Sequence, residues 1–349
     1  MSSIPFTTAL DTENFYFKEA REEPFDIYGL YKPHELSYYC RMPEEIAVNT
    51  NPKVANLFKN TSGGRIRFRT DSSRIAIHVE SDGITRFRHM PDIGASGIDV
   101  YCEINGKYRF AGTYHNHQQD FGHEGLIAFA GPGQEREIMI HMPNYSNVVN
   151  FYIGLENGAT LDHGKKYLPG KPIVYYGSSI TQGGCASRPG NAYTHIISIN
   201  NNRDFINLGF SGSGRGEEIV AKYISTLEMS AFVLDYDWNA PTPEHLEATH
   251  EKFFKIIREK HPELPVVIIS KPDFYAAENK GGDNMLAAKR RDIIYRTYSN
   301  ALNSGDKNVK FIDGACLFKG TNPDACTVDG THPNDLGFMR MAEVIGNAL

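Results

Sequence analysis

The stretch Ile173-Val174-Tyr175-Tyr176-Gly177-Ser178-Ser179-Ile180-Thr181 joins a short apolar run to a polar turn. The apolar run is typical of a buried strand that ends at Gly177. Similar runs recur downstream, and segments with a helical pattern alternate with them, at residues 205–208, 232–234 and 266–269 for the strands and 243–259 and 284–303 for the helices. Strands that alternate with helices are typical of a parallel sheet covered on both faces. The C-terminal half therefore predicts a three-layer α/β fold.

A different pattern occupies the chain upstream of this stretch. From about residue 60 to residue 155, apolar and polar residues alternate with a period of two, which indicates strands. Asn105-Gly106 lies between two such runs and favours a tight hairpin turn. No long helical pattern interrupts the region, so it predicts an antiparallel β-sandwich of the jelly-roll type. A turn-rich segment begins near residue 156, and we expect one domain at 1–165 and a second at 166–349.

Two local patterns predict details of these domains. The arginines that alternate with apolar residues, Arg65, Arg67, Arg69 and Arg74, are expected on the solvent-exposed face of a sheet. Pro333 suits the first turn of a closing helix over residues 333–349.

The composition excludes several classes of partner. The 349 residues carry a formal net charge of −6 without any basic block, so we expect neither nucleic acid nor a membrane as a partner. No apolar run approaches the roughly 20 residues of a membrane span. The first residues, Met1 to Phe6, lack the basic and apolar regions of a secretory signal, which predicts a cytoplasmic location.

The five cysteines are scattered and form no Cys-x-x-Cys pair, so they indicate neither zinc nor redox chemistry. Cys316 and Cys326 are close enough in sequence to form a disulfide, although free thiols are favoured in a reducing cell. The sequence leaves open whether these two residues pair and whether the chain forms a homo-oligomer.

Residues that could take part in catalysis follow the predicted strands at several places and recur in the C-terminal loop. They are Ser179, Gly212, Asn239, Asp329 and His332. Ligands of open parallel sheets bind at the carboxyl ends of the strands, so we expect these residues to lie close together. A serine hydroxyl, donors for an oxyanion, and an imidazole with a carboxylate are the groups that serine-dependent acyl transfer requires. The three-residue spacing of Asp329 and His332 allows the carboxylate to accept from Nδ1 while Nε2 faces the serine.

Two other kinds of site are weakly indicated. A glycine-rich loop at residues 209–216 resembles a nucleotide-binding turn, but Glu217 stands where the third glycine of a dinucleotide fingerprint belongs. A histidine cluster lies in a loop without the framework of a metal site, and its members are His115, His117, His123 and Asp120. We therefore expect neither an organic cofactor nor a metal.

The order of these signals resembles the SGNH (GDSL-type) hydrolase superfamily over residues 170–349, with a flavodoxin-like sheet. Residues Gly97-Ile98-Asp99-Val100-Tyr101 are similar to the Gly-x-Asp-Leu-Tyr motif of β-sandwich domains that precede such hydrolases. The resemblance implies that Ser179 is the nucleophile. It also implies that the oxyanion is bound by Ser179, Gly212 and Asn239. Ser178 replaces the usual aspartate, and the Trp238-Asn239 block departs from the usual Gly-x-Asn-Asp form.

Two-domain proteins of this arrangement are similar to bacterial carbohydrate acetylesterases, including those that act on acetylated mannan oligosaccharides. The resemblance implies a serine esterase that removes O-acetyl groups from an oligosaccharide through an acetyl-serine intermediate. Trp238 is expected either to contact the substrate or to belong to the core. Two alternatives remain open: a lipid or thioester acylhydrolase with the same triad, and a non-catalytic carbohydrate-binding protein.

Overall fold

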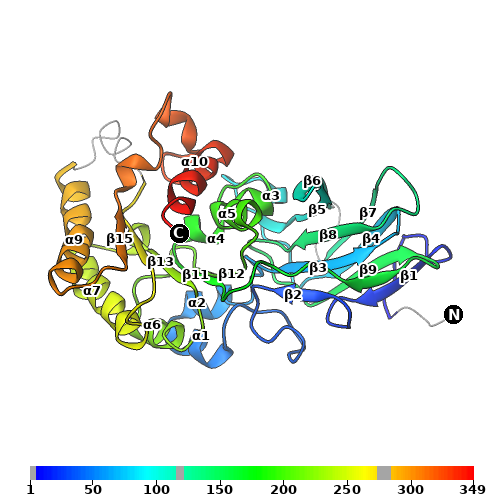
Figure 1. The fold of residues 1–349 in the computed structure, drawn as a ribbon, viewed down its shortest axis with the longest axis horizontal. Coiled ribbons are helices and arrows are strands. Elements are labelled where there is room, and N and C mark those ends of the chain that lie inside the picture. Colours follow the sequence, from blue (N-terminus) through cyan, green and yellow to red (C-terminus); the bar gives the residue numbers. More distant parts are fainter. Residues whose placement is uncertain (1–4, 115–121, 273–283) are drawn as a thin grey trace. The chain divides into compact units, whose positions relative to one another are not determined.

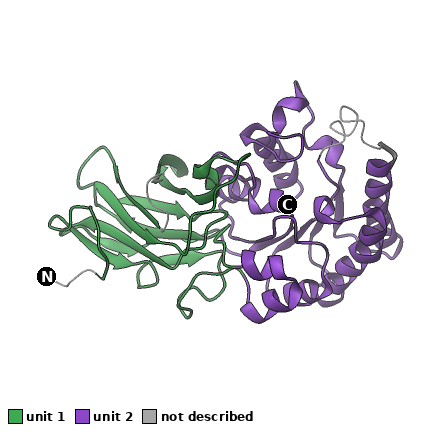
Figure 2. Ribbon diagram, turned by 180° about the vertical axis from the view of Figure 1, so that it is seen from behind, with its two compact units in different colours: residues 1–41, 59–167, 188–190 green, residues 42–58, 168–187, 191–349 purple. Residues whose placement is uncertain are grey.

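The computed structural model describes residues 5–114, 122–272 and 284–349. The chain forms two compact units (Figure 2). Unit 1 comprises residues 1–41, 59–167 and 188–190, and unit 2 comprises residues 42–58, 168–187 and 191–349. Each unit therefore takes up segments that are separated in the sequence.

Unit 1 contains two antiparallel sheets, as the period-two pattern predicts (Figure 1). The first has the order β1 (Phe15–Glu19), β9 (Asn150–Glu156), β4 (Arg74–Glu80), β7 (Gly122–Ala128). The second has the order β10 (Leu161–His163), β3 (Arg65–Thr70), β8 (Arg136–His141), β5 (Ile98–Ile104), β6 (Lys107–Tyr114), with β2 (Asp26–Tyr28) also paired to β3. A short helix, α3 (Asp92–Ser96), precedes β5.

The core of unit 1 is built from alternate residues of both sheets. Ile75 and Ile77 of β4 belong to the same buried cluster as Ile66 and Phe68 of β3. The predicted hairpin is confirmed, since β5 and β6 pair directly across Asn105-Gly106. Both turn residues have positive φ, 52° and 78°, as a two-residue hairpin turn requires.

The prediction for the alternating arginines is wrong for two of the four. Arg65 and Arg67 are buried at 0% and 1% exposure. The guanidinium of Arg67 lies 3.7 Å from the ring centroid of Tyr167, and Arg65 donates to the carbonyl of Gly63. Periodicity shows which residues share a face of β3, but later residues cover that face, and stacking on an aromatic ring allows a guanidinium to be buried.

Unit 2 contains one sheet in which every pairing is parallel. Its order is β12 (Phe205–Gly209), β11 (Ile173–Gly177), β13 (Ala231–Asp235), β14 (Val266–Ile269), β15 (Val309–Ile312). In chain order this is 2-1-3-4-5, the flavodoxin-like arrangement. The strand order reverses around β11, and ligands of such sheets bind at the carboxyl ends of the strands at this reversal.

Helices cover both faces of this sheet (Figure 1). One face carries α4 (Ser179–Gln182), α5 (Tyr193–Asn201) and α10 (Asp335–Gly346), and the other carries α6 (Glu218–Ile224), α7 (Pro243–Lys260) and α9 (Asn284–Asn303). Successive residues of β11 point to opposite layers: Tyr175 packs with Tyr193 and Phe205, whereas Tyr176 packs with Phe253. The three-layer α/β prediction is confirmed.

Two details of unit 2 differ from simple expectation. The closing helix α10 begins at Asp335, where Asn334 accepts a hydrogen bond from the Gly337 N–H, whereas Pro333 forms a bridge with Thr327. Two short helices from the N-terminal half, α1 (Glu44–Thr50) and α2 (Pro52–Leu57), belong to unit 2, where α1 packs on α6.

All five cysteines are free thiols, so Cys316 and Cys326 do not pair. The described residues contain no helix with the length and apolarity that crossing a bilayer requires.

Candidate active site

A tight turn directly after β11 carries Ser179. The N–H of Ser178 donates to the carbonyl of Asp235 at the end of the neighbouring strand β13, and the Ser178 hydroxyl caps α4 by accepting from the Ile180 N–H at 3.1 Å. A Cβ on Gly177 would lie 2.0 Å from Thr181 Oγ1 and 2.4 Å from that carbonyl, so only glycine fits. Ser179 therefore occupies the first helical position, while Ser178 is fully buried.

Ser179, His332 and Asp329 form a continuous hydrogen-bonded chain. Ser179 Oγ lies 3.0 Å from His332 Nε2, and His332 Nδ1 lies 2.8 Å from Asp329 Oδ2. The other carboxylate oxygen accepts from the backbone N–H groups of Thr331 and His332, at 2.9 and 2.8 Å. Burial alone would raise the pKa of Asp329, but the hydrogen bonds from His332 outweigh it and hold the pKa below its usual value. The ionised carboxylate orients the imidazole with Nε2 toward the serine.

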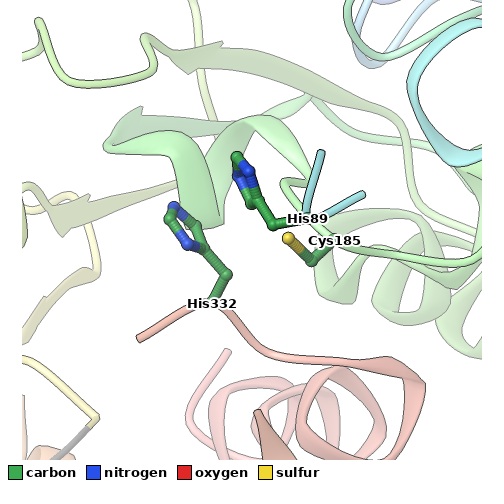
Figure 3. A group of neighbouring side chains, drawn as sticks. All are labelled: His89, Cys185 and His332. Carbon is green, nitrogen blue, oxygen red and sulfur yellow. The ribbon is translucent and has the colours of Figure 1, made fainter. Parts of the chain in front are cut away.

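Cys185 is a second nucleophilic side chain in this part of unit 2. Figure 3 shows it with His332, which comes from the loop before α10; His89, also drawn there, belongs to unit 1. Burial, together with the charge of Asp329, raises the pKa of the Cys185 thiol to about 12. Because the thiolate is the reactive form, Cys185 is a poor nucleophile near neutral pH.

Besides Ser179, the predicted oxyanion donors are Gly212 and Asn239, which lie on the loops after the two strands that flank β11. Gly212 follows β12 and has a φ of +64°, which a glycine adopts readily. Asn239 ends the 3-10 turn η2 (Asp237–Asn239) after β13, and its Nδ2 donates to the Phe210 carbonyl at 2.9 Å. The side chain of Gln182 in α4 accepts from the Ser211 N–H at 2.9 Å. Hydrogen bonds thus connect both loops to each other and to the helix that begins at Ser179.

Family comparison agrees with this geometry. Residues 170–349 match the GDSL-like lipase/acylhydrolase family, and residues 15–161 match the N-terminus of the SGNH-hydrolase-type esterases. The first match covers more than half of the chain. The chain belongs to the GDSL-like lipase/acylhydrolase family. It is a carboxylic ester hydrolase.

Solved structures extend the likeness over both units. A Bacteroides ovatus protein described as a GDSL-like lipase is 30% identical, covering 95% of this chain and 96% of that one, with a TM-score of 0.85. The salicylyl-acyltransferase SsfX3 of a tetracycline biosynthetic pathway is 22% identical, covering 95% and 96%, with a TM-score of 0.74. An acetyl xylan esterase from the rumen bacterium Butyrivibrio proteoclasticus is 11% identical, covering 96% and 97%, with a TM-score of 0.61. The last two share the fold. A comparison with curated proteins gave no match.

Sequence reasoning missed several residues that hold this GDSL-type site together. Asp235 at the end of β13 is fully buried and accepts from Thr181 Oγ1 and Tyr193 Oη, each at 3.1 Å. Burial raises the pKa of Asp235 to about 7. Sequence reasoning also missed Gln182, which accepts from the Ser211 N–H, and Arg290 of α9, which pairs with Asp237 in the turn before Asn239. A buried strand that ends in aspartate was the one signal available, and it does not reveal the partners of that carboxyl group.

Trp238 is only partly buried and packs against the core cluster of unit 2. The ammonium of Lys271 lies 4.5 Å from the centroid of its ring. The tryptophan, which directly precedes Asn239, thus touches both the core and a cationic side chain.

The histidine cluster of the sequence falls largely outside the described residues, since only His123 is described, and that side chain is buried in β7. Among the residues that the structure describes, no three His, Cys, Asp or Glu side chains of one unit converge closely enough to share a metal ion.

Proposed function

We propose that this hydrolase removes O-acetyl groups from carbohydrate, with Ser179 as nucleophile, His332 as general base and acid, and Asp329 as the orienting carboxylate. The observation that carries the catalytic assignment is the unbroken chain Ser179–His332–Asp329 at the carboxyl ends of parallel strands. The N–H groups of Ser179 and Gly212 and the amide of Asn239 are the proposed oxyanion donors. An amide carries two N–H groups, so Asn239 can bind Phe210 with one and an oxyanion with the other.

The proposed reaction has two halves. His332 Nε2 takes the proton of Ser179 as Oγ attacks the acetyl carbonyl carbon, and the carbonyl electron pair moves onto its oxygen. The resulting oxyanion collapses, the bond to the sugar oxygen breaks, and His332 gives its proton to that oxygen. Water then attacks the acetyl-serine and gives one proton to His332, which returns it to Ser179 as the bond to Oγ breaks; acetic acid leaves and ionises to acetate in solution. Asp329 stabilises the imidazolium that forms in each half.

The choice of an acetylated sugar is supported by shared fold and by accessibility. The acetyl xylan esterase from Butyrivibrio proteoclasticus has the same fold over nearly the whole length of both chains. Ser179 is 8% exposed and His332 lies at a partly exposed loop, so the reacting atoms can meet a substrate held at the surface. We assign Trp238 to the substrate-contacting surface because aromatic rings stack well on the apolar faces of sugars and its ring is partly exposed beside Asn239.

The experiment measures acetate release from 4-nitrophenyl acetate and from acetylated manno- and xylo-oligosaccharides, with the Ser179→Ala variant in parallel. Serine-dependent release from an acetylated oligosaccharide would support the whole proposal. Release from the small ester alone would support the catalytic residues and contradict the substrate. A preference for long-chain esters would favour a lipid or thioester acylhydrolase, and glycan binding without any turnover would favour a binding protein.

A further inference from the structure

A buried ion pair lies directly beneath the turn that carries Asn239. Arg290 of α9 donates from Nε to Asp237 Oδ1 at 2.8 Å, and the two side chains are 9% and 1% exposed. The other carboxylate oxygen of Asp237 accepts from the Lys271 N–H at 2.9 Å. Both oxygens of the carboxylate are therefore used by groups from two other parts of unit 2.

The same guanidinium also binds the backbone of the turn at both ends. Arg290 Nη2 donates to the carbonyl of Asp237 and, at 3.0 Å, to the carbonyl of Ala240. These two carbonyls flank Trp238 and Asn239, so the fork of Arg290 fixes the conformation of the short turn between them. A lysine has one compact ammonium group and cannot reproduce these diverging bonds.

We propose that Arg290, together with Asp237, is a positioning residue that aims the Asn239 amide at the oxyanion. A buried ion pair is weak evidence for a gain in stability, because removing two charges from water is costly. A pair that holds a donor in place has a separate effect, since a shift of about 1 Å in a reacting group can cost about 10²-fold in rate. The inference rests on the proposed role of Asn239 as an oxyanion donor.

The test is a kinetic double-mutant cycle of Arg290→Lys with Asn239→Ala, using kcat for 4-nitrophenyl acetate. Asn239→Ala alone is expected to lower kcat by about 10²–10³. Arg290→Lys alone is expected to lower kcat by about 10- to 100-fold with little change in KM, because the oxyanion exists only after attack. In the Asn239→Ala background, Arg290→Lys is expected to change kcat by less than about twofold.

The chain offers a matched control in Arg258. It also pairs with a carboxylate, Asp306, at 2.8 Å, and its guanidinium also binds backbone carbonyls, among them that of Leu264 at 2.7 Å. These partners precede β14 and β15, so this pair lies at the amino ends of the strands, away from the site. Arg258→Lys is expected to lower Tm about as much as Arg290→Lys and to leave kcat unchanged.

Equal losses of kcat from Arg290→Lys in both backgrounds would overturn the inference while leaving Asn239 as a donor. An unchanged kcat for Arg290→Lys alone would overturn it as well. If instead Asn239→Ala retains the parent kcat, Asn239 is not an oxyanion donor, and the inference, which rests on that role, is overturned with it. Should Arg290→Lys not fold, Asp237→Asn takes its place in the cycle, because it keeps an acceptor for the Lys271 N–H and removes the charge.

Discussion

At the scale of single residues, the carboxyl group of Asp235 is strongly affected by its burial. It is fully buried under the helix that begins at Ser179 and accepts from Thr181 and Tyr193. Burial raises its pKa from 3.8 to about 7. Because the folded chain holds this proton more tightly than the unfolded chain, protonated Asp235 stabilises the fold, and this contribution is lost as the pH rises through 7.

This gives a prediction for stability against pH. Between about pH 4 and 7, the free energy of unfolding of the parent, minus that of Asp235→Asn, should fall by at most about 1.4 kcal/mol per pH unit. Above that range the difference should be constant. Urea unfolding followed by tryptophan fluorescence measures it in unit 2, because Trp238 is the chain's single tryptophan. A difference that is flat or rises with pH would contradict the raised pKa.

A second prediction separates two adjacent serines. Ser179→Ala should lower kcat by about 10⁴–10⁶, as loss of a triad nucleophile does. Ser178→Ala removes the hydroxyl that caps α4, so it should cost about 1 kcal/mol in the free energy of unfolding and leave most of the activity. Steady-state kinetics of the purified variants measures kcat, and urea unfolding measures the free energy of unfolding. If Ser178→Ala were inactive and Ser179→Ala active, Ser178 and not Ser179 would be the nucleophile.

The sequence predicts the residues of this site better than the residues that support them. Ser179, Asp329 and His332 stand at strand ends or in one loop, where topology alone brings functional side chains together. Gln182 and Arg290 form hydrogen bonds with backbone groups of other loops. Sequence spacing does not indicate which backbone group a side chain will bind. Asp329 and His332 are predictable because three residues separate them, whereas Arg290 lies 53 residues from Asp237.

At the scale of elements, the turn from β11 into α4 is packed too tightly for a side chain at Gly177. Gly177→Ala would place its Cβ 2.4 Å from the Asp235 carbonyl, so β11 and β13 must separate or the turn must move. We expect Gly177→Ala to destabilise unit 2 by more than about 2 kcal/mol and to lower kcat by about 10²-fold or more.

Gly346→Ala is the matched control for this change. Gly346 ends α10, and a Cβ there would meet Ile197 at an ordinary 3.5 Å. Alanine in a helix is favoured over glycine by up to about 1 kcal/mol, so this variant should keep the parent kcat and at least the parent stability. Trp238 fluorescence in urea and kcat are compared for both. A Gly177→Ala variant indistinguishable from Gly346→Ala would show that the turn can relax.

The elements themselves follow from local pattern where one face of each is buried. Alternation predicts strands between about residues 60 and 155, and Asn105-Gly106 predicts its hairpin, because the period and the turn chemistry are local properties. It does not predict β1, β2 and β10, which lie outside that range and complete the two sheets. Arg65 and Arg67 contradict the pattern because burial depends on what covers the second face of β3. Coverage is a tertiary property, so alternation in one strand cannot predict it.

At the scale of the whole molecule, residues 42–58 belong to unit 2 although they precede most of unit 1 in the sequence. Their helices have local signals: Asn51 caps α2, and Pro52 occupies its first turn. Nothing in these signals identifies the unit on which the helices pack. Asn51 Nδ2 donates to Ser213 O at 3.3 Å and to Glu217 Oε1 at 3.0 Å, so this segment binds the loop that carries Gly212.

A chain of residues 168–349 alone therefore lacks part of its own unit. Without residues 42–58, the surface of α6 that α1 covers is exposed to water, and the loop after β12 loses its bonds to Asn51. We expect this chain to unfold at lower urea concentration than unit 2 in the full protein, as reported by Trp238, and to lose activity. Asn51→Ala in the full chain removes the loop contact and the cap of α2 but keeps α1 and α2 in the chain. It should cost about 1 kcal/mol through the lost helix cap and reduce kcat less than the deletion does. A fragment with parent stability and parent kcat would show that residues 42–58 are dispensable to the fold and to the site.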